Sequence, residues 1–253
     1  MPSAHLMHAT TPDSAERDNI MPVFSRWLGS WQISVQRRVL SAEELSEVYD
    51  REAGSWDSTI QQFGFPTAYE AMLQHAIPSK VLAPSSGEPL RVLDAGIGSG
   101  GLSKALANVC SAPLQLSGCD ISTGMLEAAE QSLRQLGLSA ELIQNDVQAL
   151  PYATGQFDIV MAAHVLEHLV DPHRALSEMV RVLKPGGILI ACLTRRSSLG
   201  AYVQWKWRTH NVSNDQARSW LAKHKLEAVR CISFEGVRCR KLSVACVGRK
   251  PLT

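Results

Sequence analysis

The stretch Val92–Gly101, VLDAGIGSGG, decides how the rest of the chain is interpreted. A short apolar run of the kind found in buried strands ends at an acidic residue, and glycines then lead into a segment with helical spacing. Glycine loops of this kind let the backbone approach a nucleotide closely. Two interpretations fit the letters. Gly96, Gly98 and Gly101 form the G-x-G-x-x-G of a dinucleotide site, whereas Asp94 followed by Gly96, Gly98 and Gly100 indicates a different nucleoside site.

The surrounding chain alternates strand-like apolar runs with amphipathic helical segments from about residue 90 to residue 194. Such alternation is typical of a parallel sheet covered by helices on both faces. The last two strand-like runs, 226–234 and 241–248, are joined by too few residues for a parallel crossover. The sequence therefore predicts that the last strand is antiparallel.

A second acidic residue follows the next strand, 19 positions after Gly101. This residue, Asp120, can accept hydrogen bonds from the two hydroxyls of a ribose under either interpretation. Asp94 distinguishes the two, because a carboxylate beside the loop repels a pyrophosphate and attracts an ammonium group. The sequence thus favours a nucleoside that carries a cationic amino-acid group.

At this point the chain resembles the class I S-adenosylmethionine-dependent methyltransferases, over roughly residues 49–248. The motifs that carry the resemblance are VLDAGIGSG, GCDIS with Met125, QNDVQALPYATGQFDIV and VLEHLVDPHRALSEMVRVLKPGG. The subgroup looks like the one that contains the ubiquinone and menaquinone biosynthesis enzymes. The resemblance implies S-adenosylmethionine as cofactor and a Rossmann-like α/β fold, with a seven-stranded, mostly parallel sheet, an antiparallel last strand and helices on both faces.

The resemblance also implies a set of cofactor-binding residues. Asp120 would bind the ribose, Ile121 and Met125 would pack on the adenine, and Asp146 would accept from the adenine amino group. Plain structural roles stay open, with Met125 as core and Asp146 as a turn residue. The full set is Tyr49, Trp56, Asp94, Gly96, Gly98, Gly100, Asp120, Ile121, Met125, Asp146, Val147 and Ala163.

His164, Glu167 and His168 spell H-x-x-E-H, the signature of inverted zinc proteases. Their place after the fourth sheet strand argues against zinc, because the LEHLVDP segment recurs there in the methyltransferase family. We therefore expect no metal. His164 falls where an acceptor would meet the methyl group, so it is the predicted catalytic residue, either as a base or as an orienting group.

The acceptor is expected to be a small apolar or aromatic molecule, methylated on a ring carbon or an oxygen. Its binding residues are predicted in the segment after the fifth strand, at Arg195, Arg196, Tyr202, Trp205 and His210. The alternatives are a phospholipid or amine N-methyltransferase and a cofactor-binding regulator without turnover. No N-P-P-Y-like motif follows the fourth strand, so no nucleic-acid substrate is expected.

Three regions are expected along the chain: a tail and amphipathic helix over 1–40, a helical cap over 41–89 and the cofactor-binding core over 90–253. Ser41 and Glu44 form a capping box that predicts the start of the cap helix. Within 21–40, apolar residues recur at helical spacing, which suggests a membrane contact, a lid or a homodimer contact. They are Phe24, Trp27, Leu28 and Trp31.

The charge is unevenly distributed, although the formal net charge is only +1. From Asp171 onward there are 16 Lys and Arg against 5 Asp and Glu. This basic region is typical of a protein that meets an anionic partner or that simply has a solvated face. The six cysteines lie mostly in apolar runs, which predicts reduced thiols and a cytoplasmic location.

Overall fold

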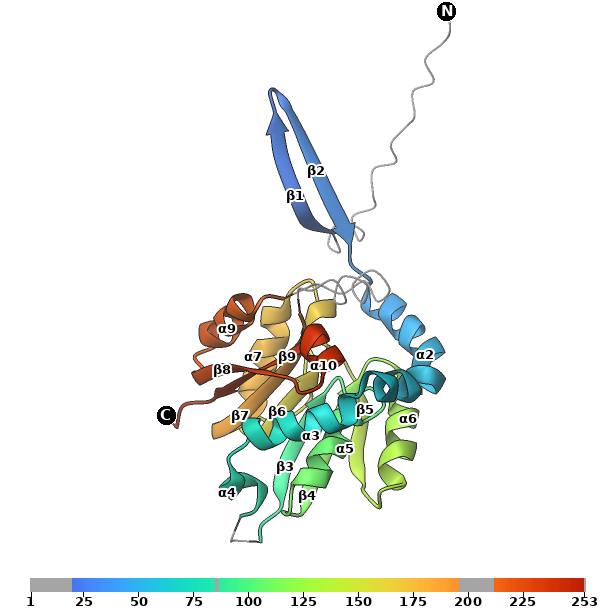
Figure 1. Cartoon of the computed structure of the whole chain (residues 1–253), viewed down its shortest axis with the longest axis vertical. Coiled ribbons are helices and arrows are strands. Elements are labelled where there is room, and N and C mark those ends of the chain that lie inside the picture. Colours follow the sequence, from blue (N-terminus) through green and yellow to red (C-terminus); the bar gives the residue numbers. More distant parts are fainter. Residues whose placement is uncertain (1–19, 85–86, 196–211, 253) are drawn as a thin grey trace, which may run out of the picture.

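The computed structural model describes residues 20–84, 87–195 and 212–252. The elements, in chain order, are β1 (Ile20–Leu28), β2 (Trp31–Arg38), α2 (Ala42–Phe63), α3 (Phe65–Ala76), α4 (Ser79–Leu82), β3 (Leu90–Ala95), α5 (Gly101–Val109), β4 (Leu114–Asp120), α6 (Thr123–Arg134), β5 (Ala140–Gln144), β6 (Phe157–Ala163), η1 (Leu166–His168), α7 (Pro172–Val182), β7 (Leu183–Thr194), α9 (Asn214–Lys223), β8 (Glu227–Ser233), α10 (Val237–Leu242) and β9 (Ser243–Arg249) (Figure 1).

The central sheet has seven strands in the order β5-β4-β3-β6-β7-β9-β8. The strands β3 to β7 pair in parallel, whereas β9 pairs antiparallel with both β7 and β8. The predicted sheet with an antiparallel last strand is confirmed. Strand order reverses between β3 and β6, and in such sheets ligands bind beyond the carboxyl ends of the strands at that reversal.

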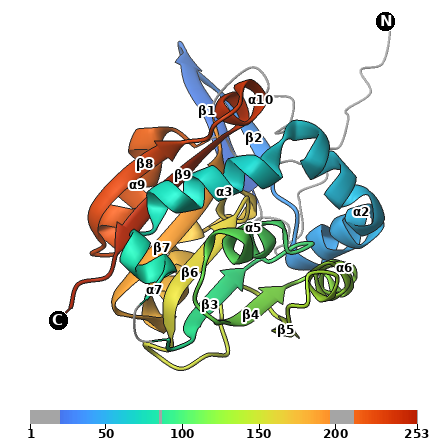
Figure 2. The same ribbon diagram turned by 60° about the horizontal axis from the view of Figure 1, so that its bottom comes forward.

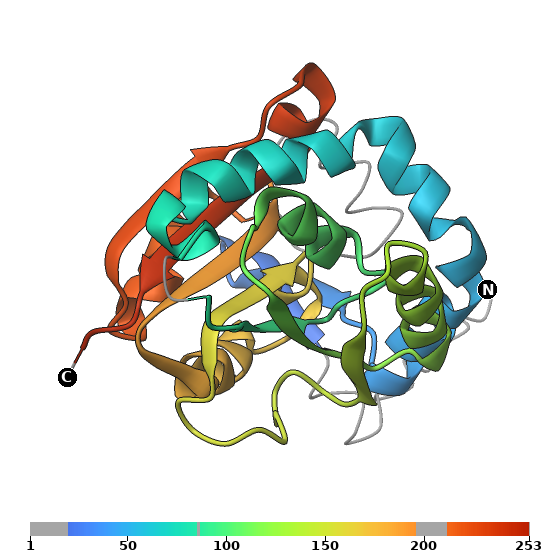
Figure 3. The same ribbon diagram turned by 90° about the horizontal axis from the view of Figure 1, so that it is seen from below.

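Helices cover both faces of this sheet (Figures 2 and 3). On one face α3, α5 and α6 form an apolar core, in which Leu73 and Leu106 are completely buried. On the other face α7 and α9 form a second core, in which Leu176 and Leu221 are completely buried. Because its strands are buried on both faces, the sheet is a fixed platform for the loops at its edge.

The helix α2 begins where the sequence signals predict. The Ser41 side chain accepts from the backbone N–H of Glu44, and the Glu44 carboxylate accepts from the backbone N–H of Ser41. This capping box satisfies free donors at the first turn of α2. α2 ends at Gly64 in the left-handed conformation, and Pro66 then occupies the first turn of α3 as expected.

The prediction of an amphipathic helix within 21–40 is wrong, because β1 and β2 form an antiparallel hairpin. A two-residue loop, Gly29–Ser30, joins the strands, and Gly29 has a φ of +62°. A positive φ at the first loop residue matches the twist of a tight hairpin. The apolar spacing fits a helix equally well, but the turn chemistry favours strands.

Leu166–His168 form a turn of 3₁₀-helix, and the KPGG segment, residues 184–187, lies within β7. One further expectation differs from the structure. Cys231 and Cys246, which are register partners on β8 and β9, form a disulfide, so the prediction of six reduced thiols is wrong for this pair. Linear spacing did not reveal which cysteines the strand register brings together.

Candidate active site

A cavity of about 380 Å³ lies at the carboxyl ends of β3, β4 and β6, under the N-terminal part of α2. It brings together eleven of the residues predicted for the site: Tyr49, Asp94, Gly96, Gly98, Asp120, Ile121, Met125, Asp146, Val147, Ala163 and His164. Gly100 does not line the cavity but is the N-cap of α5. Trp56 lies in α2 with its side chain outside the described part, and Arg196, Tyr202, Trp205 and His210 lie outside the described residues.

The glycine loop after β3 packs against Val165 at Gly96 and borders open space at Gly98. A Cβ at Gly96 would collide with Val165, and Gly96 has a φ of +79°. A Cβ at Gly98 would meet nothing within 4 Å, although Gly98 lines the cavity. The loop thus packs tightly behind Gly96 and leaves room for a ligand beside Gly98.

Asp94 lies in the wall of the cavity and is 1% exposed. Its Oδ2 accepts a 2.7 Å hydrogen bond from the Ser103 hydroxyl, whereas its Oδ1 is buried without a partner among the described residues. Burial raises the pKa of this carboxyl to about 7, and the nearby negative charge of Asp120 contributes to the rise. An unsatisfied carboxylate oxygen in a cavity wall fits an ammonium group.

Asp120, at the end of β4, is held in a fixed orientation by the backbone. Its Oδ2 accepts from Gly98 N at 2.9 Å and its Oδ1 from Ser122 N at 3.0 Å. Burial raises the pKa of Asp120, and these N–H bonds oppose the rise. A carboxylate has about four acceptor positions, so the side chain retains capacity for ribose hydroxyls. Ser122, not Asp120, caps α6 with its side chain.

An apolar wall continues from Asp120. Ile121, Met125 and Val147 line the cavity, and Met125 is 1% exposed in the absence of ligand. Asp146 lines the same region, and its Oδ1 accepts from Gln148 N at 2.8 Å, as a turn residue does. The core role of Met125 and the turn role of Asp146 are therefore compatible with a place in the ligand cavity.

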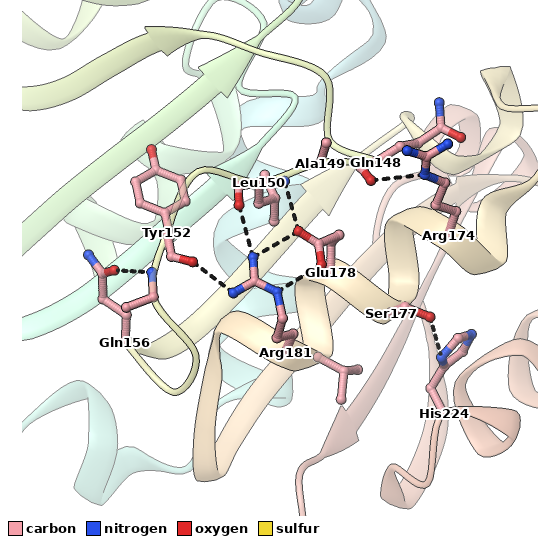
Figure 4. Close-up of polar contacts among 12 residues, drawn as sticks. Gln148, Ala149, Leu150, Tyr152, Gln156, Arg174, Ser177, Glu178, Arg181 and His224 are labelled. Carbon is pink, nitrogen blue, oxygen red and sulfur yellow. Dashed lines mark hydrogen bonds and ion pairs between the residues drawn. The ribbon is translucent and has the colours of Figure 1, made fainter.

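The loop that carries Asp146 and Val147 is tied to α7 by Arg181 (Figure 4). Arg181 donates to the carbonyl oxygens of Tyr152 and Leu150 at 2.7 and 2.8 Å. It also forms two 2.8 Å bonds with Glu178, whose Oε2 accepts from Leu150 N. This bidentate pair orders the loop. Glu178 and Arg181 lie three residues apart on one face of α7. This spacing is so common in helices that the sequence does not reveal how the pair orders the loop.

One face of α2 closes the cavity from above. Ser46 donates to the Ile121 carbonyl at 3.0 Å, and the Tyr49 hydroxyl lies 2.9 Å from His168 Nε2. Asp50 accepts from the Ser122 hydroxyl at 2.5 Å and from Gly124 N at 3.0 Å. These three α2 residues share one helical face. Tyr49 thus reaches the site as predicted, while Ser46 and Asp50 were not identified from the sequence.

His164 directly follows β6, with a φ of +59° that is unusual for a residue with a side chain. Its Nδ1 lies 3.0 Å from Glu167 Oε1 and 3.2 Å from the Thr194 hydroxyl. Its Nε2 lies 3.3 Å from the Ser243 hydroxyl, and both Ser243 and Thr194 line the cavity. Backbone strain of this kind is found at functional sites, where surrounding contacts hold it in place.

Glu167 is completely buried behind His164. Burial alone would raise the pKa of Glu167, but hydrogen bonds from His164 and Thr194 and the charges of His164 and His168 lower it overall. Thr194 donates to Oε1 from its backbone N–H at 2.9 Å and from its hydroxyl at 2.8 Å. Glu167 is therefore an ionised partner that orients the imidazole. The H-x-x-E spacing carries this signal, although we interpreted it from sequence only as a rejected zinc motif.

Arg195, which the sequence predicts as an acceptor-binding residue, does not contact the cavity. Its Nη1 donates to the Arg240 carbonyl at 3.0 Å, and the residue does not line the cavity. Among the described residues, no group of three or more His, Cys, Asp or Glu side chains is arranged to hold a metal. Within the same part of the chain, no helix combines the length and the apolarity required to cross a membrane.

Comparison with known proteins agrees with this geometry. Residues 93–191 match the family model described as a methyltransferase domain. The chain thus carries a class I S-adenosylmethionine-dependent methyltransferase domain, with S-adenosylmethionine as its cofactor. Relatives include the demethylmenaquinone methyltransferase of Clavibacter sepedonicus, which is 28% identical over 81% of this chain and 85% of that protein.

The named relatives are quinone-biosynthesis enzymes. The ubiquinone/menaquinone biosynthesis C-methyltransferase UbiE of Pseudomonas savastanoi pv. phaseolicola is 37% identical, but over only 40% of each chain. UbiE of Psychromonas ingrahamii is 30% identical over 56% of this chain, and the match spans 58% of that relative. The matched region therefore spans about half the length of each of these two enzymes.

Solved structures share the fold at lower identity. Magnesium protoporphyrin IX methyltransferase from Synechocystis PCC 6803 superposes with a TM-score of 0.62 at 16% identity, over 85% of this chain and 99% of that one. The [4+2]-cyclase SpnF superposes with a TM-score of 0.67 at 19% identity, over 85% and 98% of the chains. Because a cyclase shares the fold, the reaction must be argued from the site.

Proposed function

We propose that this protein transfers the methyl group of S-adenosylmethionine to a ring carbon of a small, apolar or aromatic acceptor. The two UbiE relatives, which are named as C-methyltransferases, support carbon over oxygen as the acceptor atom. The observation that carries the proposal is the pair of carboxylates in one cavity, with Asp94 buried and Asp120 half-buried. Asp94 offers an unsatisfied oxygen for an ammonium group, and Asp120 offers a fixed carboxylate for a ribose.

The apolar part of the cavity supports an apolar acceptor. Beyond the cofactor residues, it is lined by Phe65, Tyr69, Ile60 and Leu242. Phe65 lies edge-on to His164, with ring centroids 5.6 Å apart. Aromatic rings in this arrangement would pack against the acceptor ring and hold it beside the imidazole. The acceptor thus binds between the cofactor residues and His164.

The cofactor, when bound, supplies an activated methyl group on a sulfonium, so alignment of the acceptor does much of the catalysis. A ring carbon must also lose a proton, which goes to a base. In the proposed mechanism His164 Nε2 accepts that proton, directly or through the Ser243 hydroxyl. Glu167 keeps the Nδ1 proton in place and stabilises the positive charge that the ring gains.

A test of this mechanism is methyl transfer to a panel of phenols, quinols and amines, followed as release of S-adenosylhomocysteine. We expect turnover with an aromatic acceptor. His164→Ala should lower kcat about 10²–10⁴-fold and leave cofactor affinity unchanged. Glu167→Gln should also lower kcat, because the imidazolium that forms during the reaction loses its anionic partner. Full activity of His164→Ala would exclude its role as a base.

Two other functions make different predictions in the same panel. A phospholipid or amine N-methyltransferase, favoured by the basic C-terminal third, would methylate amines only. A regulatory protein without turnover would bind S-adenosylmethionine yet release no S-adenosylhomocysteine with any acceptor. The intact hydrogen-bonded surroundings of His164 favour an enzyme over a regulator.

The remaining parts of the proposal concern the whole chain. We assign the cap role to 41–89 and the core to 90–253, supported by the contacts of α2 over the cavity. A cytoplasmic location also belongs to the proposal; the four free cysteines support it, whereas the Cys231–Cys246 disulfide counts against it. A peripheral membrane contact through 21–40 belongs to this proposal, and so does a homodimer. Sedimentation velocity tests the homodimer, and cell fractionation tests the location.

A further inference from the structure

The β1–β2 hairpin concentrates exposed apolar side chains at its tip. Seven large hydrophobic residues are exposed in the described part of the chain, and four of them lie in the hairpin, between residues 27 and 33. They are Trp27, Leu28, Trp31 and Ile33, and Trp31 is 77% exposed. Single exposed hydrophobics are ordinary, but a contiguous group marks an interaction surface.

The strand register places most of this group in one row. Leu28 pairs with Trp31 across the hairpin, and Arg26 pairs with Ile33 next to them. Cross-strand partners share a face, so Leu28, Trp31 and Ile33 form an apolar row with one arginine beside it. Trp27 adds its ring at the tip.

The opposite face of the hairpin is polar except for Trp27 near the tip. On this face Ser25 pairs with Ser34, and Trp27 pairs with Gln32. Gln32 Nε2 donates to the Ser25 hydroxyl at 2.7 Å, and the Ser25 and Ser34 hydroxyls lie 3.4 Å apart. The apolar surface of the hairpin therefore consists of the row on one face together with Trp27 near the tip of the other face.

Its charge is of one sign only. Residues 20–38 contain three arginines, Arg26, Arg37 and Arg38, and no acidic residue. Clustered arginines are attracted to the negative surface of a bilayer that contains anionic lipid. Tryptophan rings are favoured at the boundary between headgroups and acyl chains. The apolar tip and its tryptophans match a lipid surface. The positive charge matches an anionic lipid better than it matches a second copy of this hairpin, because the second copy carries the same positive charge.

The position of the hairpin connects this surface to the active site. The hairpin extends from the body of the molecule on the side where α2 begins (Figure 1). Val39, directly after β2, is buried in the body, and the next two residues, Leu40 and Ser41, line the cavity. A bilayer that holds the hairpin tip would therefore face the side of the molecule on which α2 begins and on which Leu40 and Ser41 line the cavity.

We propose that the hairpin docks this protein on an anionic bilayer, with Trp27, Leu28 and Trp31 inserted among the headgroups. Docking delivers a lipid-soluble acceptor to the cavity, and this last step rests on the methyltransferase function proposed above. The docking itself requires neither cofactor nor acceptor.

The test is flotation of the full chain with two kinds of vesicle, one of phosphatidylcholine and one of phosphatidylcholine and phosphatidylglycerol in equal parts. The wild type should float with the anionic vesicles and much less with the neutral ones. The variant Trp27→Ser/Leu28→Ser/Trp31→Ser should partition at least about tenfold less, and Arg26→Gln should partition less at low salt. Leu136→Ser is the matched control, because Leu136 is 50% exposed elsewhere and should float like the wild type.

The triple variant must keep wild-type affinity for S-adenosylmethionine, which shows that the domain is folded. Asp120→Ala should float normally, so a failure of the cofactor site is distinguishable from a failure of docking. Equal flotation of the triple variant and the wild type would overturn the proposal. It would also be overturned if the wild type ignored both vesicles and sedimented as a dimer that the triple substitution dissociates, since the surface would then serve a second copy.

Discussion

At the scale of single residues, Asp94 is the residue that we propose to bind the ammonium group of S-adenosylmethionine. The carboxyl is nearly inaccessible, has one unsatisfied oxygen and has a pKa raised to about 7 by burial. In the free protein it is therefore largely protonated at pH 6 and largely ionised at pH 8. An ammonium group binds to the ionised form, so binding at the lower pH must release a proton.

We predict that the affinity for S-adenosylmethionine rises with pH through the neutral range. Because the free carboxyl has a pKa of about 7, the affinity should be roughly tenfold lower at pH 6 than at pH 7.5. Titration calorimetry in buffers of different ionisation enthalpy measures both the affinity and the proton release. Asp94→Asn is the control and should bind weakly with little pH dependence. A flat profile in the wild type would rule out this role of Asp94.

A second residue prediction concerns the ribose. Asp120→Ala should weaken the binding of S-adenosylmethionine by about 1–3 kcal/mol, because charge-assisted hydrogen bonds are lost. Asp120→Asn is the matched variant, since it can still accept from Gly98 N, and should lose less. Competition binding with S-adenosylhomocysteine measures both. Wild-type affinity in Asp120→Ala would contradict the assignment.

At this scale the sequence predicted the residues that depend on local order along the chain. Asp94 and Asp120 each follow a recognisable strand, so the parallel sheet brings them to one edge. The role of Glu167 was not predicted. It depends on a single turn of 3₁₀-helix that brings its carboxylate to His164 and Thr194, and Thr194 is distant in sequence.

At the scale of elements, α7 holds in place the loop that carries Asp146 and Val147 in the wall of the cavity. We predict that Arg181→Met lowers the free energy of unfolding by about 1–3 kcal/mol, because its two bonds to loop carbonyls and its bidentate pair with Glu178 are lost. Hydrogen exchange in 145–156 should increase, and cofactor affinity should fall. Urea unfolding provides the free energies.

The matched control for that prediction is Arg174→Met on the same helix. Arg174 donates a 3.2 Å bond to the Gln148 carbonyl of the loop, so its substitution should lower the free energy of unfolding by no more than about 1 kcal/mol. Equal effects of the two substitutions would mean that the Arg181 contacts do not order the loop.

Element boundaries followed from sequence where caps and prolines define them, as at Ser41 and Pro66. They failed where two periodicities coincide. In 21–40 the residues Phe24, Trp27, Leu28 and Trp31 fit a helical face, but Gly29–Ser30 folds the segment so that Leu28 and Trp31 become cross-strand partners. The tight turn at Gly29–Ser30 therefore determines the structure of this segment, and the helical spacing of its apolar residues does not.

At the scale of the whole molecule, the hairpin is a separate two-stranded sheet, whereas the seven-stranded sheet contains the core. We predict that removal of residues 1–38 shifts Tm by only a few degrees and leaves cofactor affinity within about twofold, because all the core residues in the described part of the chain lie at or after Val39. Differential scanning calorimetry and titration check this. A loss of cooperative unfolding would show that the hairpin is part of the folding unit.

The most direct measurement of the central claim is a crystal structure of the protein grown with S-adenosylhomocysteine and NAD⁺ both present. The account predicts the sulfur compound in the cavity, with its amino group within hydrogen-bond distance of Asp94 Oδ1 and its ribose hydroxyls on Asp120. A dinucleotide with its pyrophosphate on the Gly96–Gly100 loop would contradict it.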